Sequence, residues 1–406
     1  MPKKTSTTTA SEAAPPSTSP KTTVLKENLS AALKHTLKCV GKDSVLPILS
    51  HVLLQAEAGR LKIACTNLEL ATTTWIGAKV HDDFAIAVPA KTFNDIIGLL
   101  PDVPVDLTYD LRTCSLTIQS GEYKSHLKGL PAEDFPIIPS VGASVGTGFE
   151  LPADQLREAL RRTIFAASTE DNRPILTGLL FKVVDGNLVI AATDGFRLAK
   201  ALLPAANIPP DLSVIVPAHS CQHLMSLLKD GAVTVSILNH RNQIGFRTAD
   251  GSELVSALIE GTFPEYETII PKSHSVFVHT EPLRRACRSA DVFARENGRT
   301  IKIAVQARDD HRPSGLTIQS SSAETGNHHS FVDAVVEGEP LDIAFNVKYL
   351  LDVLDLGDEQ LWLEMTTPVA PAVLRPAGEA ASLFVLMPMR FADQKPHSPK
   401  PEPDPA

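Results

Sequence analysis

The feature that most constrains the fold is a threefold internal repeat, whose copies recur at nearly equal intervals along the chain. The stretch LPILSHVLLQ, which contains Pro47, is similar to RPILTGLLFK, which contains Pro174. IACTNLELA and IAATDGFRLA follow in the same order, and Thr66 and Thr193 are separated by the same interval as the two prolines. Each unit fills about a third of the 406 residues, so it is too long for a solenoid repeat and long enough to bury a core of its own. The sequence therefore predicts an array of three similar domains.

Each repeat is predicted to begin with an amphipathic helix. The segments 28–40, 154–166 and 281–293 align at a constant offset, with apolar residues at i, i+3, i+4 and i+7. Asp154 is a candidate N-cap, and Pro282 suits a first helical turn. VPAKTFNDIIGLL, VPAHSCQHLMSLL and FNVKYLLDVLDL indicate a second helix in each repeat. Short runs of alternating apolar residues between the helices predict antiparallel strands.

The expected fold class is α+β, with two helices packed on antiparallel sheets in every repeat. The repeat places the three domains at 24–147, 148–273 and 274–391. Residues 1–23 are rich in Thr, Ser and Pro, and residues 392–406 are rich in Pro. Such segments bury too little apolar surface to order themselves, so we expect a disordered N-terminal extension and a disordered C-terminal tail.

Composition and charge exclude several classes of protein. The 406 residues carry a net charge of −9, so the bulk basic balance of many nucleic-acid binders is absent. No apolar run approaches the roughly 18 residues of a membrane-spanning helix, so no membrane association is expected. The five cysteines are far apart, which favours buried thiols in a reducing cytosol over a zinc site. We therefore predict a cytoplasmic protein that uses no metal and no cofactor.

Basic residues nevertheless recur at equivalent helix positions. Exposed Lys and Arg are ordinary on any single helix, and most charged faces only contact water. The same sign at the same position of several repeats, in an acidic chain, instead predicts contact with a polyanion. These residues are Lys34, Arg157, Arg161, Arg284 and Arg288 on the first helices, and Lys91 and Lys348 on the second helices.

One catalytic pattern occurs in the chain. Ser144 lies in a G-x-S-x-G stretch at 142–146. A nucleophile elbow needs a strand directly before the serine and a helix directly after it, and neither is predicted here. We interpret the stretch as a linker between repeats, and a serine hydrolase that uses Ser144 remains the alternative.

The motifs LPIL, VPAKTF, ATDGFRLA, TFPEYETIIP, FNVKYLLDVL and VLMPMR occur in this order over residues 24–391. Together they resemble the bacterial DNA polymerase III beta subunit family, the sliding clamps. The resemblance implies a non-catalytic processivity factor of DNA replication built from three clamp domains. It also implies a homodimeric ring that encircles double-stranded DNA without sequence specificity and slides along it.

The resemblance further implies sites and partners. DNA contacts carried over by motif are Lys42, Lys91, Arg173, Pro174 and Ile175. A hydrophobic pocket is expected to bind peptides of the DNA polymerase III alpha subunit, the clamp loader, other clamp-binding polymerases and repair proteins. Its residues would be Leu176, Thr193, Gly195, Arg197, Leu198, Pro264, Ile269, Asn346, Tyr349, Val369, Val385, Leu386, Met387, Pro388, Met389 and Arg390.

The chain also departs from the family pattern. Phe196 stands where His is common, Thr268 stands where a basic residue can occur, and Asp43 occupies a loop position that is basic in some members. The family usually ends just after the MPMR motif, whereas 15 residues follow Phe391 here. A diverged clamp that serves repair or a mobile element's polymerase is therefore a second alternative.

Overall fold

The computed structural model describes residues 19–41, 46–141, 148–205, 207–238, 242–270, 275–308, 313–378 and 381–390. The chain forms two compact units, residues 1–139 and 140–406. The first unit holds the first repeat, and the second unit holds the other two. Lys42, Asp43, Ser144 and the predicted C-terminal tail lie outside the described residues.

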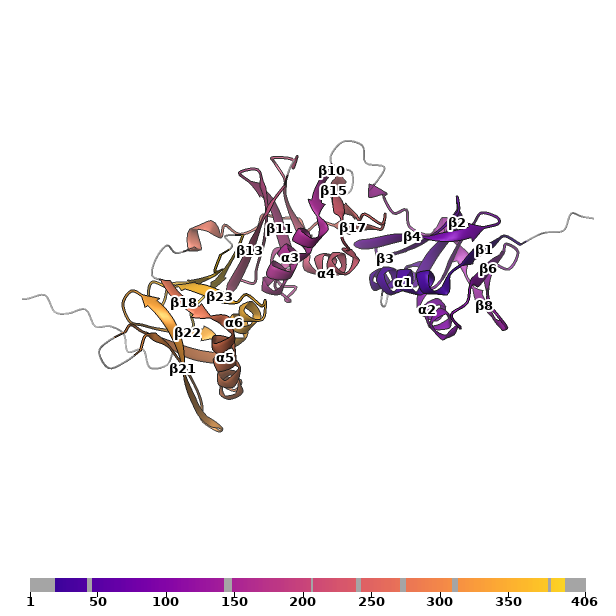
Figure 1. Cartoon of the computed structure of the whole chain (residues 1–406). Coiled ribbons are helices and arrows are strands. Elements are labelled where there is room, and N and C mark those ends of the chain that lie inside the picture. Colours follow the sequence, from indigo (N-terminus) through magenta and orange to yellow (C-terminus); the bar gives the residue numbers. More distant parts are fainter. Residues whose placement is uncertain are drawn as a thin grey trace, which may run out of the picture. The chain divides into compact units, whose positions relative to one another are not determined.

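The first unit contains the helices α1 (Lys26–Thr36) and α2 (Ala90–Leu99), which pack together on one side of the strands (Figure 1). Its strands are β1 (Lys21–Val24), β2 (His51–Glu57), β3 (Arg60–Thr66), β4 (Leu70–Val80), β5 (Phe84–Pro89), β6 (Val105–Asp110), β7 (Ser115–Ser120), β8 (Tyr123–Lys128) and β9 (Leu130–Pro131). The long strand β4 joins two antiparallel series, β4–β1–β6–β7–β8 and β4–β3–β2–β5–β9.

The second repeat contains α3 (Ala153–Thr163) and α4 (Ala218–Leu227). Its strands are β10 (Gly148–Pro152), β11 (Gly178–Val184), β12 (Asn187–Thr193), β13 (Arg197–Pro204), β14 (Ser213–Pro217), β15 (Ala232–Leu238), β16 (Gln243–Arg247) and β17 (Glu253–Ala257). The third repeat contains α5 (Thr280–Ala294) and α6 (Val347–Leu354). Its strands are β18 (Ser275–His279), β19 (Thr300–Gln306), β20 (Gly315–Ser322), β21 (Gly326–Glu337), β22 (Leu341–Asn346), β23 (Gln360–Glu364), β24 (Ala372–Pro376) and β25 (Ser382–Leu386).

The strand pairings confirm the threefold repeat. The series β5–β2–β3–β4 of the first repeat recurs as β14–β11–β12–β13 and as β22–β19–β20–β21. The series β1–β6–β7–β8 likewise recurs as β10–β15–β16–β17 and as β18–β23–β24–β25. In each repeat the two helices pack against each other. The predicted α+β class with two helices on antiparallel sheets is therefore correct.

Within the second unit, one strand pair joins the second and third repeats. β13 and β25 are antiparallel, with Leu198 opposite Val385 and Ala199 opposite Phe384. This pair turns the β14–β11–β12–β13 series and the third repeat into one twelve-stranded sheet. The backbone hydrogen bonds of a sheet thus run without a break from one repeat into the next.

The two faces of this sheet are covered by different elements. On one face, Phe384 is fully buried with its ring 6.0 Å from that of Phe165, which lies in the short turn Ile164–Ala166 after α3. On the other face, Leu198 and Val385 belong to an apolar cluster that also contains Tyr266 and packs against Phe263. Successive residues of a strand point to opposite faces, so the β13–β25 pair contributes to both cores.

Two predicted boundaries are wrong in detail. The expected disordered extension ends at residue 23, but β1 begins at Lys21, where it pairs with β4 and β6. The side chains of Thr22 and Val24 on this strand are buried in the core. Asp154 does not cap α3, because Pro152 occupies that position. Asp154 lies in the first turn instead, where a negative charge still interacts favourably with the helix dipole.

Four of the five cysteines are buried, as predicted, and Cys114 is half-buried. Burial raises the pKa of the Cys39 and Cys287 thiols to about 12, so both stay protonated and unreactive. Among the described residues no helix is long and apolar enough to cross a membrane.

Replacing Phe384 with Ala tests the contribution of the β13–β25 sheet to stability. A fully buried phenylalanine leaves a cavity on truncation, so we expect the free energy of unfolding to fall by about 3–5 kcal/mol. Phe196→Ala is the matched control, because that side chain is 63% exposed. Urea denaturation of both variants measures the difference, and equal stabilities would contradict the assigned packing.

Candidate functional site

The turn between β12 and β13 is fixed by its own side chains. The Thr193 hydroxyl accepts a hydrogen bond from the Gly195 N–H at 3.1 Å and donates one to the Arg197 carbonyl at 2.6 Å. The Asp194 carboxylate accepts from the Phe196 and Arg197 N–H groups at 2.9 and 3.0 Å. Gly195 has a φ of +92°, a conformation that side chains disfavour. The predicted pocket residues of this turn are therefore held rigidly at the start of β13.

Arg197 links this turn to α6. Its guanidinium forms ion pairs with Asp194, at 3.0 Å, and with Asp352 of α6. The same group lies 4.5 Å from the ring centre of Tyr349 and 5.4 Å from that of Phe165. Burial and the nearby Asp194 charge raise the pKa of Tyr349, which stays a neutral phenol. Arg197 and Tyr349, both predicted pocket residues, are thus in direct contact.

The end of β25 lies directly beside the same turn. The Met387 N–H donates to the Phe196 carbonyl at 2.9 Å, so the strand pairing continues past Leu386. Phe196 is 63% exposed and Met387 is 37% exposed, which is unusual for side chains this apolar. Together they form an apolar surface at the seam between the second and third repeats.

The remaining pocket residues divide into three groups. Leu176, Leu198, Val385 and Leu386 are buried, and Leu198 and Val385 belong to the apolar cluster of the second and third repeats. The C-terminal residues are attached to the third repeat, since the Met389 N–H donates to the Ala344 carbonyl at 2.8 Å. The third group is mostly exposed: Pro264 and Arg390 are exposed, Pro388 is half-buried, and Val369 is 73% exposed between β23 and β24. Ile269 ends the turn Glu267–Ile269, and Asn346 caps α6 by accepting a hydrogen bond from the Lys348 N–H.

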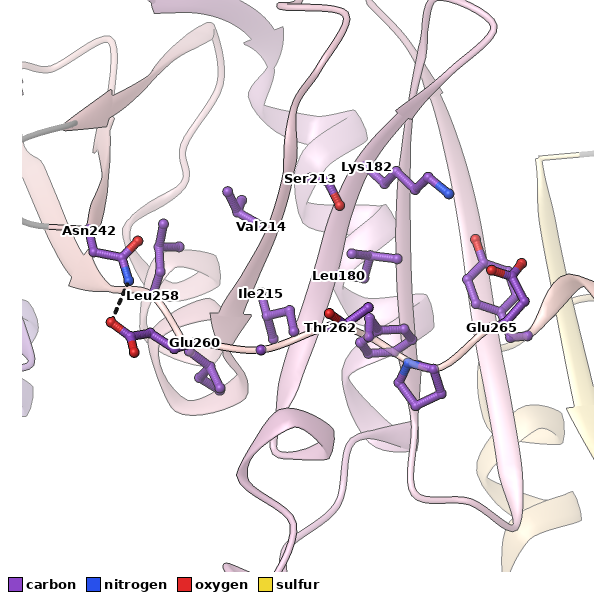
Figure 2. Close-up of a pocket in the computed structure, with 15 residues that line it drawn as sticks. Leu180, Lys182, Ser213, Val214, Ile215, Asn242, Leu258, Glu260, Thr262 and Glu265 are labelled. Atoms are coloured by element: carbon purple, nitrogen blue, oxygen red, sulfur yellow. Dashed lines mark hydrogen bonds between the residues drawn. The ribbon is translucent and has the colours of Figure 1, made fainter.

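A separate cavity of about 470 Å³ lies on the second repeat (Figure 2). It is lined by β11, β14 and the chain from Leu258 to Tyr266, and Pro264 is the one predicted pocket residue among them. Asn242 and Glu260 form a hydrogen bond of 3.5 Å at one end, and Lys182 and Glu265 lie at the other (Figure 2). The cavity is therefore distinct from the Phe196–Met387 seam, although Leu180 and Ile215 line it and belong to the same apolar cluster as Leu198.

The predicted basic residues differ in their partners. Lys34, Lys91 and Lys348 are exposed, and no carboxylate within the described ranges pairs with them. Arg157 donates to the Leu228 carbonyl, which leaves its charge uncompensated. These four side chains keep a net positive charge toward solvent.

The other helix arginines are paired with acidic groups. Arg161 contacts Glu158 at 2.7 Å, and Arg288 contacts Asp355 at 2.8 Å. Arg284 pairs with Glu281 and lies 3.6 Å from Asp355. The hydrogen bond from Arg161 is the main cause that lowers the pKa of Glu158, so this carboxylate stays charged. The repeated basic face is thus partly neutralised, which the positions of the arginines alone did not predict.

The loop before β11 serves two regions. Arg173 and Pro174 are exposed, as a contact with an external polyanion requires. Ile175 instead packs against the apolar cluster, so its side chain supports the fold. An added Cβ on Gly195 would lie 3.8 Å from the Arg173 guanidinium. Arg173 therefore lies next to the predicted pocket as well as in a predicted DNA-contact loop.

Three residues that contact the predicted sites were missed from the sequence. Phe196 was noted as a departure from the family but not as part of the pocket, although its exposure beside Met387 makes it part of the seam. Asp355 was not identified at all, because its partner Arg288 is 67 residues away in the chain. Glu158 had a detectable signal, since it lies three residues before Arg161 on one helix.

In the described part of the chain no cluster of His, Cys, Asp or Glu side chains could hold a metal ion. Sequence profiles of the DNA polymerase III beta subunit match the chain in three parts. The N-terminal domain matches residues 21–139, the central domain 150–265 and the C-terminal domain 267–390.

Individual relatives agree with the profiles. The beta sliding clamp of Synechococcus elongatus is 31% identical over 379 residues, covering 91% of this chain and 99% of the relative. The beta sliding clamp of Escherichia coli (strain K12) is 30% identical over 375 residues, covering 91% and 100%. The crystal structure of the DNA polymerase III subunit beta from Pseudomonas aeruginosa is 31% identical with a TM-score of 0.83, covering 91% and 100%.

These matches span all three repeats and leave no place for a hydrolase fold around Ser144. The chain belongs to the DNA polymerase III beta subunit family, the beta sliding clamps, and is a non-catalytic processivity factor of DNA replication.

Proposed function

We propose that two copies of this chain join head to tail into a closed ring around double-stranded DNA. The β13–β25 pair carries the proposal, because it provides a pattern for joining one repeat to the next. In that pair, the last strand of the third repeat adds to the free edge of the long strand of the second repeat. Two of the equivalent strands, the terminal strand β8 of the first repeat and the long strand β21 of the third, are the ones proposed to pair between copies.

Both of these strands have an edge available for pairing. β8 pairs with β7 alone in the described part of the chain. Residues 326–333 of β21 pair with β20 on one edge, and no described strand pairs with the other. An exposed strand edge is a template for another chain. Two head-to-tail contacts between β8 and β21 satisfy both edges and close the assembly.

Exposed apolar side chains on both strands fit such a contact. Tyr123 of β8 is 61% exposed, and Phe331 and Val335 of β21 are 38% and 57% exposed. The Gly129 N–H donates to the Cys114 carbonyl at 2.8 Å, which fixes which β8 residues face β7. Because backbone groups alternate between the two edges, the N–H groups of Lys124 and His126 point away from β7.

A closed ring holds DNA by enclosure, so its contacts need not be strong. Lys34, Lys91, Lys348, Arg157 and Arg173 supply positive charge for phosphates without reading base sequence. The ring is proposed to act in the cytoplasm.

The Phe196–Met387 seam is the proposed contact for partner peptides. An apolar surface with rigid polar groups beside it, here Arg197 and the turn around Gly195, is typical of peptide recognition. Methionine adapts to different partners, which suits a site shared by several proteins. The proposed partners are the polymerase alpha subunit, the clamp loader, other clamp-binding polymerases and repair proteins.

Lys124→Pro tests the ring. Proline removes one outward N–H of β8 and blocks strand addition, while an edge position tolerates it in the monomer. We expect light scattering to give the mass of one chain, 43.7 kDa, where the unmodified protein gives twice that value. Lys124→Ala keeps the N–H and should stay dimeric. A dimeric Lys124→Pro protein with unchanged thermal stability would show that β8 is not the interface.

Met387→Asp tests the seam. Placing a carboxylate in an apolar contact costs about 2 kcal/mol or more, so we expect at least a tenfold loss of affinity for the purified alpha subunit. Leu111→Asp is the control, since Leu111 is 68% exposed in the first unit, far along the chain from the seam. Surface plasmon resonance measures both variants. Equal binding by Met387→Asp and the control would place the partner site elsewhere.

A further inference from the structure

The turn that follows α6 gathers arginines from two repeats. Asp355 directly follows the helix, and Gly357 with a φ of +91° reverses the chain before Asp358. Arg162 of α3 forms two hydrogen bonds with Asp358, at 2.9 and 2.7 Å. Arg161 donates to the Leu356 carbonyl at 2.9 Å. On the other side of the turn, Asp355 receives the α5 arginines.

The two acidic residues of this turn differ in burial. The side chains of Arg162 and Asp358 are 14% and 13% exposed, so this pair is a structural link between repeats. The side chains of Arg288 and Asp355 are 56% and 46% exposed. Exposed ion pairs are weak, because water solvates both charges and salt screens them. A phosphate can therefore compete with Asp355 for Arg288, whereas it cannot reach Arg162.

Asp355 serves two arginines at once. One of its oxygens lies 2.8 Å from Arg288 and 3.6 Å from Arg284. Both arginines occupy the predicted DNA-facing positions of α5, and Arg284 is also paired with Glu281. Arg285, the remaining arginine on this side of α5, lies 3.6 Å from Glu281. These acidic partners thus offset the positive charge of the α5 arginines, whereas Lys34 and Lys91 in the first unit have no acidic partner within the described ranges.

We infer that Asp355 is a built-in competitor of DNA phosphate, which holds Arg288 and Arg284 and so limits how tightly the clamp grips the duplex. The inference rests on the proposed ring around DNA. Each phosphate contact releases counterions and steepens the salt dependence of binding. A clamp that encloses DNA gains nothing for retention from such contacts, and each one opposes sliding. Asp355 acts through the arginines and is therefore a positioning residue.

Asp355→Asn removes the competing charge and keeps the size of the side chain. We expect the variant to bind a 30-base-pair duplex about three to ten times more tightly at 50 mM salt. The slope of log K against log salt should steepen by about 0.9 for each phosphate newly contacted. Arg284 stays paired with Glu281, so only Arg288 of each chain gains a phosphate, and the slope of a two-chain ring should steepen by about 2. Fluorescence anisotropy between 25 and 200 mM salt measures both quantities.

Four further variants make the result specific. Asp355→Glu retains the charge and should behave like the unmodified protein. Asp342→Asn is the matched control, because Asp342 forms an exposed pair of 2.7 Å with Lys302 on the β19–β22 strands. Arg288→Gln alone should change the slope little, whereas Lys348→Gln, which removes an uncompensated charge, should lower it.

Several outcomes would overturn the inference. A slope for Asp355→Asn equal to that of the unmodified protein would do so, as would an equal gain from Asp342→Asn or a large loss from Arg288→Gln. Thermal melting and light scattering of each variant exclude a change in folding or assembly. If the unmodified protein is not retained on circular DNA, the proposed ring fails, while the short-duplex result still reports on Asp355 by itself.

Discussion

The pairing of β25 with β13 is the interaction on which the rest of the structure depends. Each repeat has one long strand and one terminal strand whose edges can pair with a further strand, and an open edge is a template for such pairing. In the second unit the two edges meet, and the sheet continues from the second repeat into the third. Among the described strands, β8 of the first repeat and residues 326–333 of β21 in the third each keep an edge without a partner strand. In the proposed ring, a second copy of the same chain pairs with both of these edges.

The same strand pair determines where partners are proposed to bind. The pairing brings the turn that ends in Arg197 beside Met387, and these segments belong to different repeats. Leu198 and Val385 of the same strand pair belong to a buried apolar cluster. Phe196 and Met387, at the end of this strand pair, stay exposed to solvent. The Phe196–Met387 seam is therefore a consequence of joining two repeats, and an isolated repeat would not contain it.

The charge distribution differs from that of a protein that binds DNA tightly. The chain has a net charge of −9, and several helix arginines are paired with Glu or Asp within the same unit. A protein that holds DNA by enclosure needs only enough positive charge to keep the duplex centred. In the proposed ring, uncompensated lysines such as Lys34 and Lys348 would meet that need without binding the duplex tightly.

Much of the fold could be predicted from the sequence, because a repeat as long as a domain preserves local patterns such as the apolar stripe of each first helix. Strand partners far apart in the chain could not be predicted, since no local signal pairs Leu198 with Val385. The start of β1 at Lys21 was missed because a Thr-rich segment looks disordered until its partners β4 and β6 are known. Asp355 was also missed because its partner Arg288 is far away in the chain. The predicted pocket residues came from a family resemblance, and the structure shows that the exposed Phe196 lies beside one of them, Met387.

The most direct test of the account is retention on DNA of defined topology. The protein is assembled on a nicked circular plasmid with its loader, and the complex is then passed over a gel-filtration column in 0.3 M salt. The account predicts that the protein stays with the circle and is lost once the plasmid is cut to a linear form, because only enclosure resists salt. Equal loss from circular and linear DNA would contradict a closed ring.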